Sequence, residues 1–200
     1  MPVTPIAAKE KIQRDAASKL KVSEQNNHLT SPFITNKHQI IIVGAGLGGL
    51  GAAIALLLAG HDVEVFEAAS EIGEVGAGIQ ILPNSSRVLQ SWGMKDALEK
   101  YATKPSQVNM RHWKGGIISS MNFAASAAQY PGTFYWDFHR ANLHKCLLER
   151  AVELGARTRV NARVTDVRVS RNGETATVVL QNGERHVADL VVELMALIVV

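Results

Sequence analysis

Three glycines and one acid between residues 44 and 67 have the types and spacing that nucleotide chemistry requires. Gly44 permits a sharp turn, Gly46 lets the backbone approach a pyrophosphate, and Gly49 removes bulk where a helix must lie close to a strand. Glu67 can accept hydrogen bonds from ribose hydroxyls, and its charge disfavours a phosphate on that ribose, which argues against NADP at this site. The pattern predicts a dinucleotide site.

A strand, a tight turn, a helix and a second strand must position these residues, and the sequence supplies each. An apolar run from Gln39 to Val43 leads into the glycines, and a leucine-rich segment follows until Gly60. A second run, from Asp62 to Phe66, ends directly before Glu67. This order predicts a Rossmann-like βαβ unit whose helix points free N–H groups at phosphates. A glycine-rich structural turn without a ligand is the alternative interpretation.

A second glycine-rich stretch, GEVGAG, follows from Gly73 to Gly78. It precedes a helix predicted from Pro83 to Trp92, with Val88, Leu89 and Trp92 on the apolar face. Residues 107–123 read as a hairpin around two glycines. The aromatic residues between 134 and 138 could line a pocket, but we expect them to pack in the core.

The last third of the chain is predicted to add a helix, a meander and a strand. The helix runs from Arg140 to Leu154. The β-meander covers residues 157–187, because two Asn-Gly turns fall between β-branched runs. The strand runs from Asp189 to Val192. The predicted fold class is therefore α/β, with a Rossmann-like βαβ domain and a β-meander insertion.

Composition argues against several classes of function. The net charge of +3 arises in the first 37 residues, and no basic stripe points to nucleic acid. Cys146 is the only cysteine, and its helical pattern favours a buried, unreactive thiol.

The apolar run from Leu190 to Val200 is too short to span a bilayer. No secretory signal is recognisable, so we expect a cytoplasmic protein. No catalytic residue and no metal-ligand cluster is predicted.

Four motifs resemble the amino-terminal part of the group A flavoprotein monooxygenases, the salicylate hydroxylase-like aromatic hydroxylases. They are GAGLGGL from Gly44, VFE ending at Glu67, GEVGAGIQILPNSSRVL from Gly73 and HRANLHKCLLERA from His139. Together they are specific, whereas the first alone would fit many FAD and NAD proteins.

The resemblance implies that the ligand is FAD. It places the first three glycines near the pyrophosphate and Glu67 on the adenosine ribose. It also implies that Gly78 lies against the cofactor and that the planar cation of Arg140 binds the pyrophosphate; a solvated charge is the alternative for Arg140. Family members reduce the flavin with NAD(P)H and use oxygen to hydroxylate an aromatic or polyketide-like small molecule.

The resemblance ends at Val192. In the family this strand continues into a glycine-alanine-aspartate-glycine turn, whereas here it continues as ELMALIVV. We therefore divide the chain into a mobile extension (1–37), an incomplete FAD-binding domain (38–192) and an apolar tail foreign to the family (193–200). The prediction is a truncated monooxygenase that is inactive alone. An NAD-dependent reductase and a non-catalytic nucleotide-binding module are the alternatives.

Overall fold

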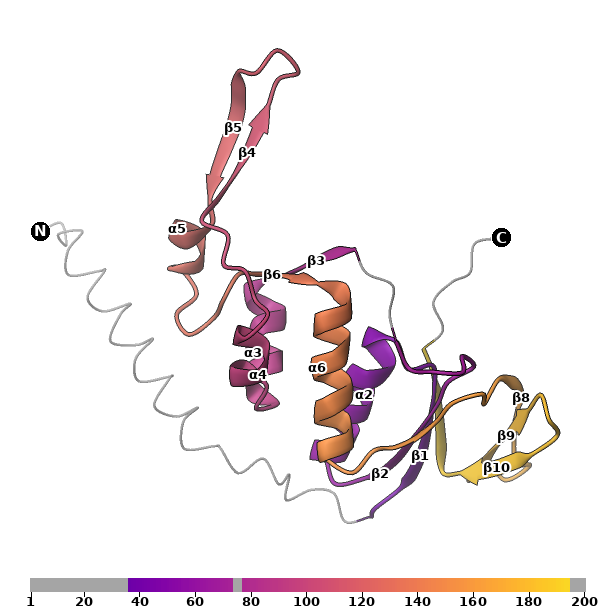
Figure 1. Ribbon diagram of the computed structural model, residues 1–200. Coiled ribbons are helices and arrows are strands. Elements are labelled where there is room, and N and C mark those ends of the chain that lie inside the picture. The colour runs from indigo at the N-terminus through magenta and orange to yellow at the C-terminus, as the bar shows by residue number, and fades with distance from the viewer. Residues whose placement is uncertain (1–35, 74–76, 195–200) are drawn as a thin grey trace, which may run out of the picture. The chain divides into compact units, whose positions relative to one another are not determined.

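A parallel sheet of apolar strands positions the first glycine turn. The computed structural model describes residues 36–73 and 77–194, so most of the predicted extension and tail lies outside the described residues. Within them the sheet has the order β11-β1-β2-β7, and all neighbouring strands are parallel; Figure 1 shows its two central strands, β1 and β2, side by side. Its strands are β1 (Gln39–Val43), β2 (Asp62–Phe66), β7 (Arg157–Arg159) and β11 (Leu190–Glu193).

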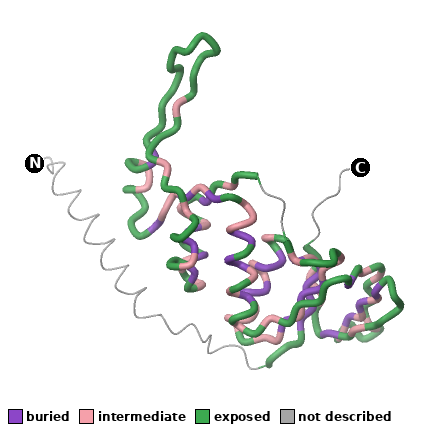
Figure 2. The backbone as a smooth tube through the Cα atoms, in the orientation of Figure 1, coloured by how far each residue is buried: buried purple, intermediate pink, exposed green. Residues whose placement is uncertain are grey.

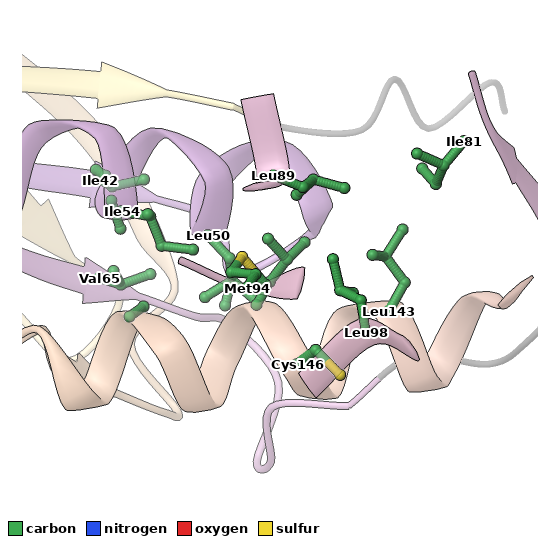
Figure 3. Close-up of a cluster of buried hydrophobic side chains, with 14 of the residues drawn as sticks. Ile42, Leu50, Ile54, Val65, Ile81, Leu89, Met94, Leu98, Leu143 and Cys146 are labelled. Atoms are coloured by element: carbon green, nitrogen blue, oxygen red, sulfur yellow. The ribbon is translucent and has the colours of Figure 1, made fainter. Parts of the chain in front are cut away.

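The predicted βαβ unit is confirmed by β1, α2 (Leu47–Leu58) and β2. The helix ends where predicted, because Gly60 adopts a φ of +95° that favours glycine. α6 (Arg140–Glu153) packs beside α2. The two helices and the sheet bury one apolar core, which includes Ile42, Leu50 and Leu143 (Figure 3).

The opposite face of the sheet packs on a three-stranded meander. Its strands are β8 (Val164–Val169), β9 (Ala176–Leu180) and β10 (Arg185–Ala188). Side chains of a strand alternate between its faces. Ile40 and Ile42 therefore belong to the core with the helices, whereas Ile41 and Val43 pack with meander residues such as Val178.

The predicted start of the meander at residue 157 is wrong. Arg157–Arg159 forms β7, which pairs with β2 in the parallel sheet, with Glu64 opposite Arg157. Both predicted Asn-Gly turns are confirmed: Gly173 has a φ of +73° and Gly183 a φ of +88°. The meander is thus an insertion between β7 and β11.

A smaller layer carries Gly78, the last residue of the second glycine stretch, of which residues 74–76 lie outside the described residues. β3 (Gly78–Ile81) pairs antiparallel with β6 (Trp136–His139), and α3 (Pro83–Ser91) and α4 (Lys95–Glu99) follow β3. Trp136 and Phe138 are buried, which confirms core packing for these two aromatic residues. Val88 is 45% exposed, so its predicted place on the apolar face of α3 is wrong. The other two residues predicted for that face are confirmed, since Leu89 belongs to the core and Trp92 packs against it.

The predicted hairpin is confirmed by β4 (Gln107–Arg111) and β5 (Ile117–Asn122), which lead into α5 (Phe123–Ala127). Both strands are exposed along almost their entire length (Figure 2). In the part of the chain that the structure describes, no helix combines the length and apolarity needed to cross a bilayer.

Candidate functional site

The first glycine turn is tightly packed at the carboxyl end of β1. Gly44 has a φ of +103°, and its N–H donates to the Phe66 carbonyl at 2.8 Å. A Cβ on Gly49 would lie 1.9 Å from the Gly44 carbonyl oxygen, so only glycine fits there. Gly46 is the N-cap residue of α2 and has no side chain to cap it. The first N–H groups of α2 are therefore available to an anionic ligand.

Glu67 follows β2 directly and is held by backbone groups. Its Oε2 accepts from the Ala45 N–H and its Oε1 from the Ala69 N–H, both at 2.9 Å. A carboxylate has about four lone-pair sites, so each oxygen can accept another hydrogen bond. The Glu67 backbone is fixed as well, by bonds to Arg159 and Ala162.

Arg140 joins the two glycine stretches. It is the first residue of α6, and its backbone N–H donates to the Ala77 carbonyl at 2.9 Å. The neighbouring residue, His139, is paired with Gly78 between β6 and β3. A Cβ on Gly78 would meet nothing within 4 Å, so packing within the protein does not require glycine there.

One cleft of about 650 Å³ brings most of the predicted site together. Gly44, Gly46, Glu67 and Arg140 all line it. Gly49 lies behind the turn rather than on the surface of the cleft. Gly78 is not among the residues that line the cleft. It is linked to the lining residue Arg140 by two neighbours: Ala77, whose carbonyl accepts from the Arg140 N–H, and His139, which pairs with Gly78 and precedes Arg140.

Several lining residues escaped the sequence-based prediction. They include Ala162 and Arg163, from the loop that leads from β7 into β8, Val164, the first residue of β8, and Leu194, which directly follows β11. The loop was missed because residues 157–159 were predicted to begin the meander, which left no loop between β7 and β8 in the prediction. Leu194 is held by its N–H, which donates to the Val43 carbonyl at 3.0 Å.

The cleft suits a dinucleotide rather than a metal or a covalent nucleophile. It offers backbone N–H groups at a helix N-terminus, a cationic side chain and a carboxylate with free lone pairs. Among the described residues, no group of three or more His, Cys, Asp or Glu side chains could hold a metal ion. Cys146 is buried as predicted, and burial raises the pKa of its thiol, which disfavours the nucleophilic thiolate.

Residues 37–192 match the family described as FAD binding domain. The chain belongs to this FAD-binding domain family. This membership confirms two predictions, the α/β fold class and FAD as the cofactor. Crystal structures agree: HpxO of Klebsiella pneumoniae, complexed with FAD, aligns with a TM-score of 0.67 and 27% identity over 77% of this chain and 38% of that one.

The curated relatives of this FAD-binding domain are FAD-dependent monooxygenases, as the motifs predicted. The monooxygenase OpS4 of Beauveria bassiana (strain ARSEF 2860) is 40% identical over 131 residues, which are 64% of this chain and 30% of that protein. The 3-hydroxybenzoate 6-hydroxylase of Polaromonas naphthalenivorans (strain CJ2) is 32% identical over 74% of this chain and 37% of that protein. The chain thus spans about a third of the length of these relatives.

Proposed function

We propose that residues 38–192 hold the ADP half of FAD in an NAD(P)H-dependent monooxygenase that hydroxylates an aromatic or polyketide-like small molecule. The observation that carries this proposal is that the glycine turn, Glu67 and Arg140 all line the same cleft. Relatives such as the 3-hydroxybenzoate 6-hydroxylase support an aromatic substrate. A cytoplasmic location stays a prediction.

The residues of the cleft fit FAD in charge and hydrogen bonding. The N–H groups at the start of α2 and the guanidinium of Arg140 would hold the pyrophosphate, because both favour an anion. Gly49 would act indirectly, by letting α2 approach Gly44. Glu67 would accept from the adenosine ribose with the lone pairs that Ala45 and Ala69 leave open.

Bound FAD would supply the redox and oxygen chemistry, so this chain's own residues need only bind and orient it. Gly78 would let the backbone of β3 lie against the cofactor, since no side chain stands between them. Arg140 would couple that strand to the pyrophosphate, because its backbone N–H bonds Ala77, which directly precedes β3, and because Arg140 lines the cleft.

The ribose assignment is tested with Glu67→Ala. We expect the affinity for FAD, measured by fluorescence titration, to fall about thirtyfold, since hydrogen bonds to a charged group are worth about 1.5–3 kcal/mol. Glu64→Ala is the matched control. Glu64 lies on β2, the strand that Glu67 follows, but its carboxylate pairs with Arg159 at 3.0 Å and Glu64 does not line the cleft.

A second comparison separates ribose recognition from damage to the turn, because Glu67 also holds the Ala45 N–H. ADP and 2′-deoxy-ADP are titrated against both proteins. The wild-type chain should prefer ADP, and the Glu67→Ala variant should lose that preference. An unchanged preference in the variant would assign the ribose to another residue.

We further propose that the 200 residues do not turn over by themselves, since they correspond to about a third of each relative. Purified chain should retain yellow flavin but should not oxidise NADH or NADPH in the presence of aromatic acids such as 3-hydroxybenzoate. Formation of a hydroxylated product would contradict the claim of inactivity. Bound NAD without flavin would favour a reductase instead.

A further inference from the structure

α6 places one buried imidazole against the first glycine turn. His144 is only 3% exposed and lies among the apolar residues Leu143 and Leu147 of the same helix. Its Nε2 is 2.7 Å from the carbonyl oxygen of Ala45. A carbonyl oxygen can only accept a hydrogen bond, so Nε2 carries the proton and donates.

Ala45 is consequently held on both sides of its Cα. Its N–H donates to Glu67 Oε2 at 2.9 Å, and its carbonyl accepts from His144. A peptide unit is planar and trans, so the Ala45 carbonyl and the Gly46 N–H point in opposite directions. The Ala45 carbonyl points at the buried imidazole, so the Gly46 N–H points away from His144, and Gly46 itself lines the cleft.

This restraint on the Ala45 peptide matters because glycines leave the backbone dihedral angles of a turn largely unrestrained. Gly44 and Gly46 flank Ala45, and residues without Cβ have wide backbone freedom that must be lost before an N–H group can face a phosphate. A donor fixed in advance binds more tightly than one that is ordered on binding. His144 lines no part of the described cleft, so its effect must pass through Ala45.

We propose that His144 is a positioning residue for the pyrophosphate of the cofactor, acting through the Ala45 carbonyl on the Gly46 N–H. The inference rests on the proposed binding of FAD at this turn. It goes beyond that binding because it assigns part of the pyrophosphate affinity to a residue that contacts no ligand.

The test compares His144→Leu, which removes the donor at similar size, with His144→Gln, whose amide can donate from a similar position. Isothermal titration measures the affinity for ADP and for adenosine, which lacks the pyrophosphate. We expect His144→Leu to weaken ADP binding about tenfold and His144→Gln to restore it to within about threefold of wild type. Adenosine binding by His144→Leu should change less than about twofold.

His112→Leu is the control for the chemical change, because His112 is exposed in the turn between β4 and β5. It should alter neither affinity. Unchanged ADP binding in His144→Leu would overturn the role of His144 and leave the FAD proposal standing. Equal losses for ADP and adenosine would overturn it too, since they would indicate general damage. A wild-type chain that binds neither ADP nor FAD would overturn the proposed function itself.

Wild-type protein provides a measurement that does not depend on how the variants fold. Long-range proton–nitrogen NMR spectra report which imidazole nitrogen carries the proton. We expect His144 to be protonated at Nε2, with a slowly exchanging proton that shifts on addition of ADP but not of adenosine. Protonation at Nδ1 alone would overturn the proposal, and so would an Nε2 proton whose chemical shift does not change when ADP is added.

Discussion

The two glycine stretches resemble each other in sequence but differ in how the protein uses them. In the first, Gly44 needs its positive φ, and Gly49 has no room for a Cβ. In the second, Gly78 has an ordinary strand conformation, and a Cβ there would meet nothing. Gly44 and Gly49 must therefore be glycine for the fold itself, whereas the fold gives neither Gly46 nor Gly78 such a reason, because a Cβ at either position would meet nothing within 4 Å.

This difference separates two kinds of glycine that sequence alone cannot distinguish. A glycine that the fold requires should reveal itself in the stability of the protein without ligand. A glycine that a ligand requires should reveal itself only in affinity. Gly78 stands next to Ala77, whose carbonyl accepts from Arg140, and Arg140 lines the cleft. Contact between Gly78 and the cofactor stays a prediction, and it would give a physical reason for glycine at this position.

The largest effect is expected from Gly49→Ala. Its Cβ would press on the Gly44 carbonyl oxygen at 1.9 Å and on the Gly44 carbonyl carbon at 3.0 Å, so α2 must move away from β1. We expect a loss of about 3 kcal/mol in the free energy of unfolding, measured with urea in the absence of FAD. Gly51→Ala, in the same helix, is the control. Its Cβ would make an ordinary 3.6 Å contact with Trp92, and it should stabilise the protein by about 0.5 kcal/mol.

If Gly49→Ala unfolded no more easily than Gly51→Ala, close packing of α2 on the turn would not be the reason for glycine. The comparison between the two stretches would then lose its basis.

Gly78→Val sharpens the other side of the comparison. We expect the free energy of unfolding without FAD to change by less than about 0.5 kcal/mol, since valine suits a strand and the space is open. The affinity for FAD should nevertheless fall about tenfold, because the side chain would occupy space that the cofactor needs. A stability loss with unchanged affinity would show that Gly78 serves the fold.

Local patterns were sufficient to predict β1, α2, β2 and the two Asn-Gly turns, because each is determined by residues close in sequence. β7 was assigned wrongly because Arg157, Thr158 and Arg159 carry no apolar signal, and only pairing with β2 makes them a strand. The same error concealed Arg163 in the cleft. His144 resembled any polar residue in an amphipathic helix, and only packing of α6 on α2 brings it to Ala45.

The smallest effect is expected from Arg140→Lys, which tests the residue that links both stretches. The substitution keeps the charge and the backbone bond to Ala77 but removes the planar fork that binds phosphate oxygens in pairs. FAD affinity should fall about threefold, within the range of one weakened hydrogen bond. Arg163→Lys is the matched control, since Arg163 lines the same cleft beside Ala162, which bonds the carbonyl of Glu67. A larger loss of FAD affinity for Arg163→Lys than for Arg140→Lys would assign the pyrophosphate contact to Arg163, on the Glu67 side of the cleft. The second glycine stretch would then have no residue that links it to the first.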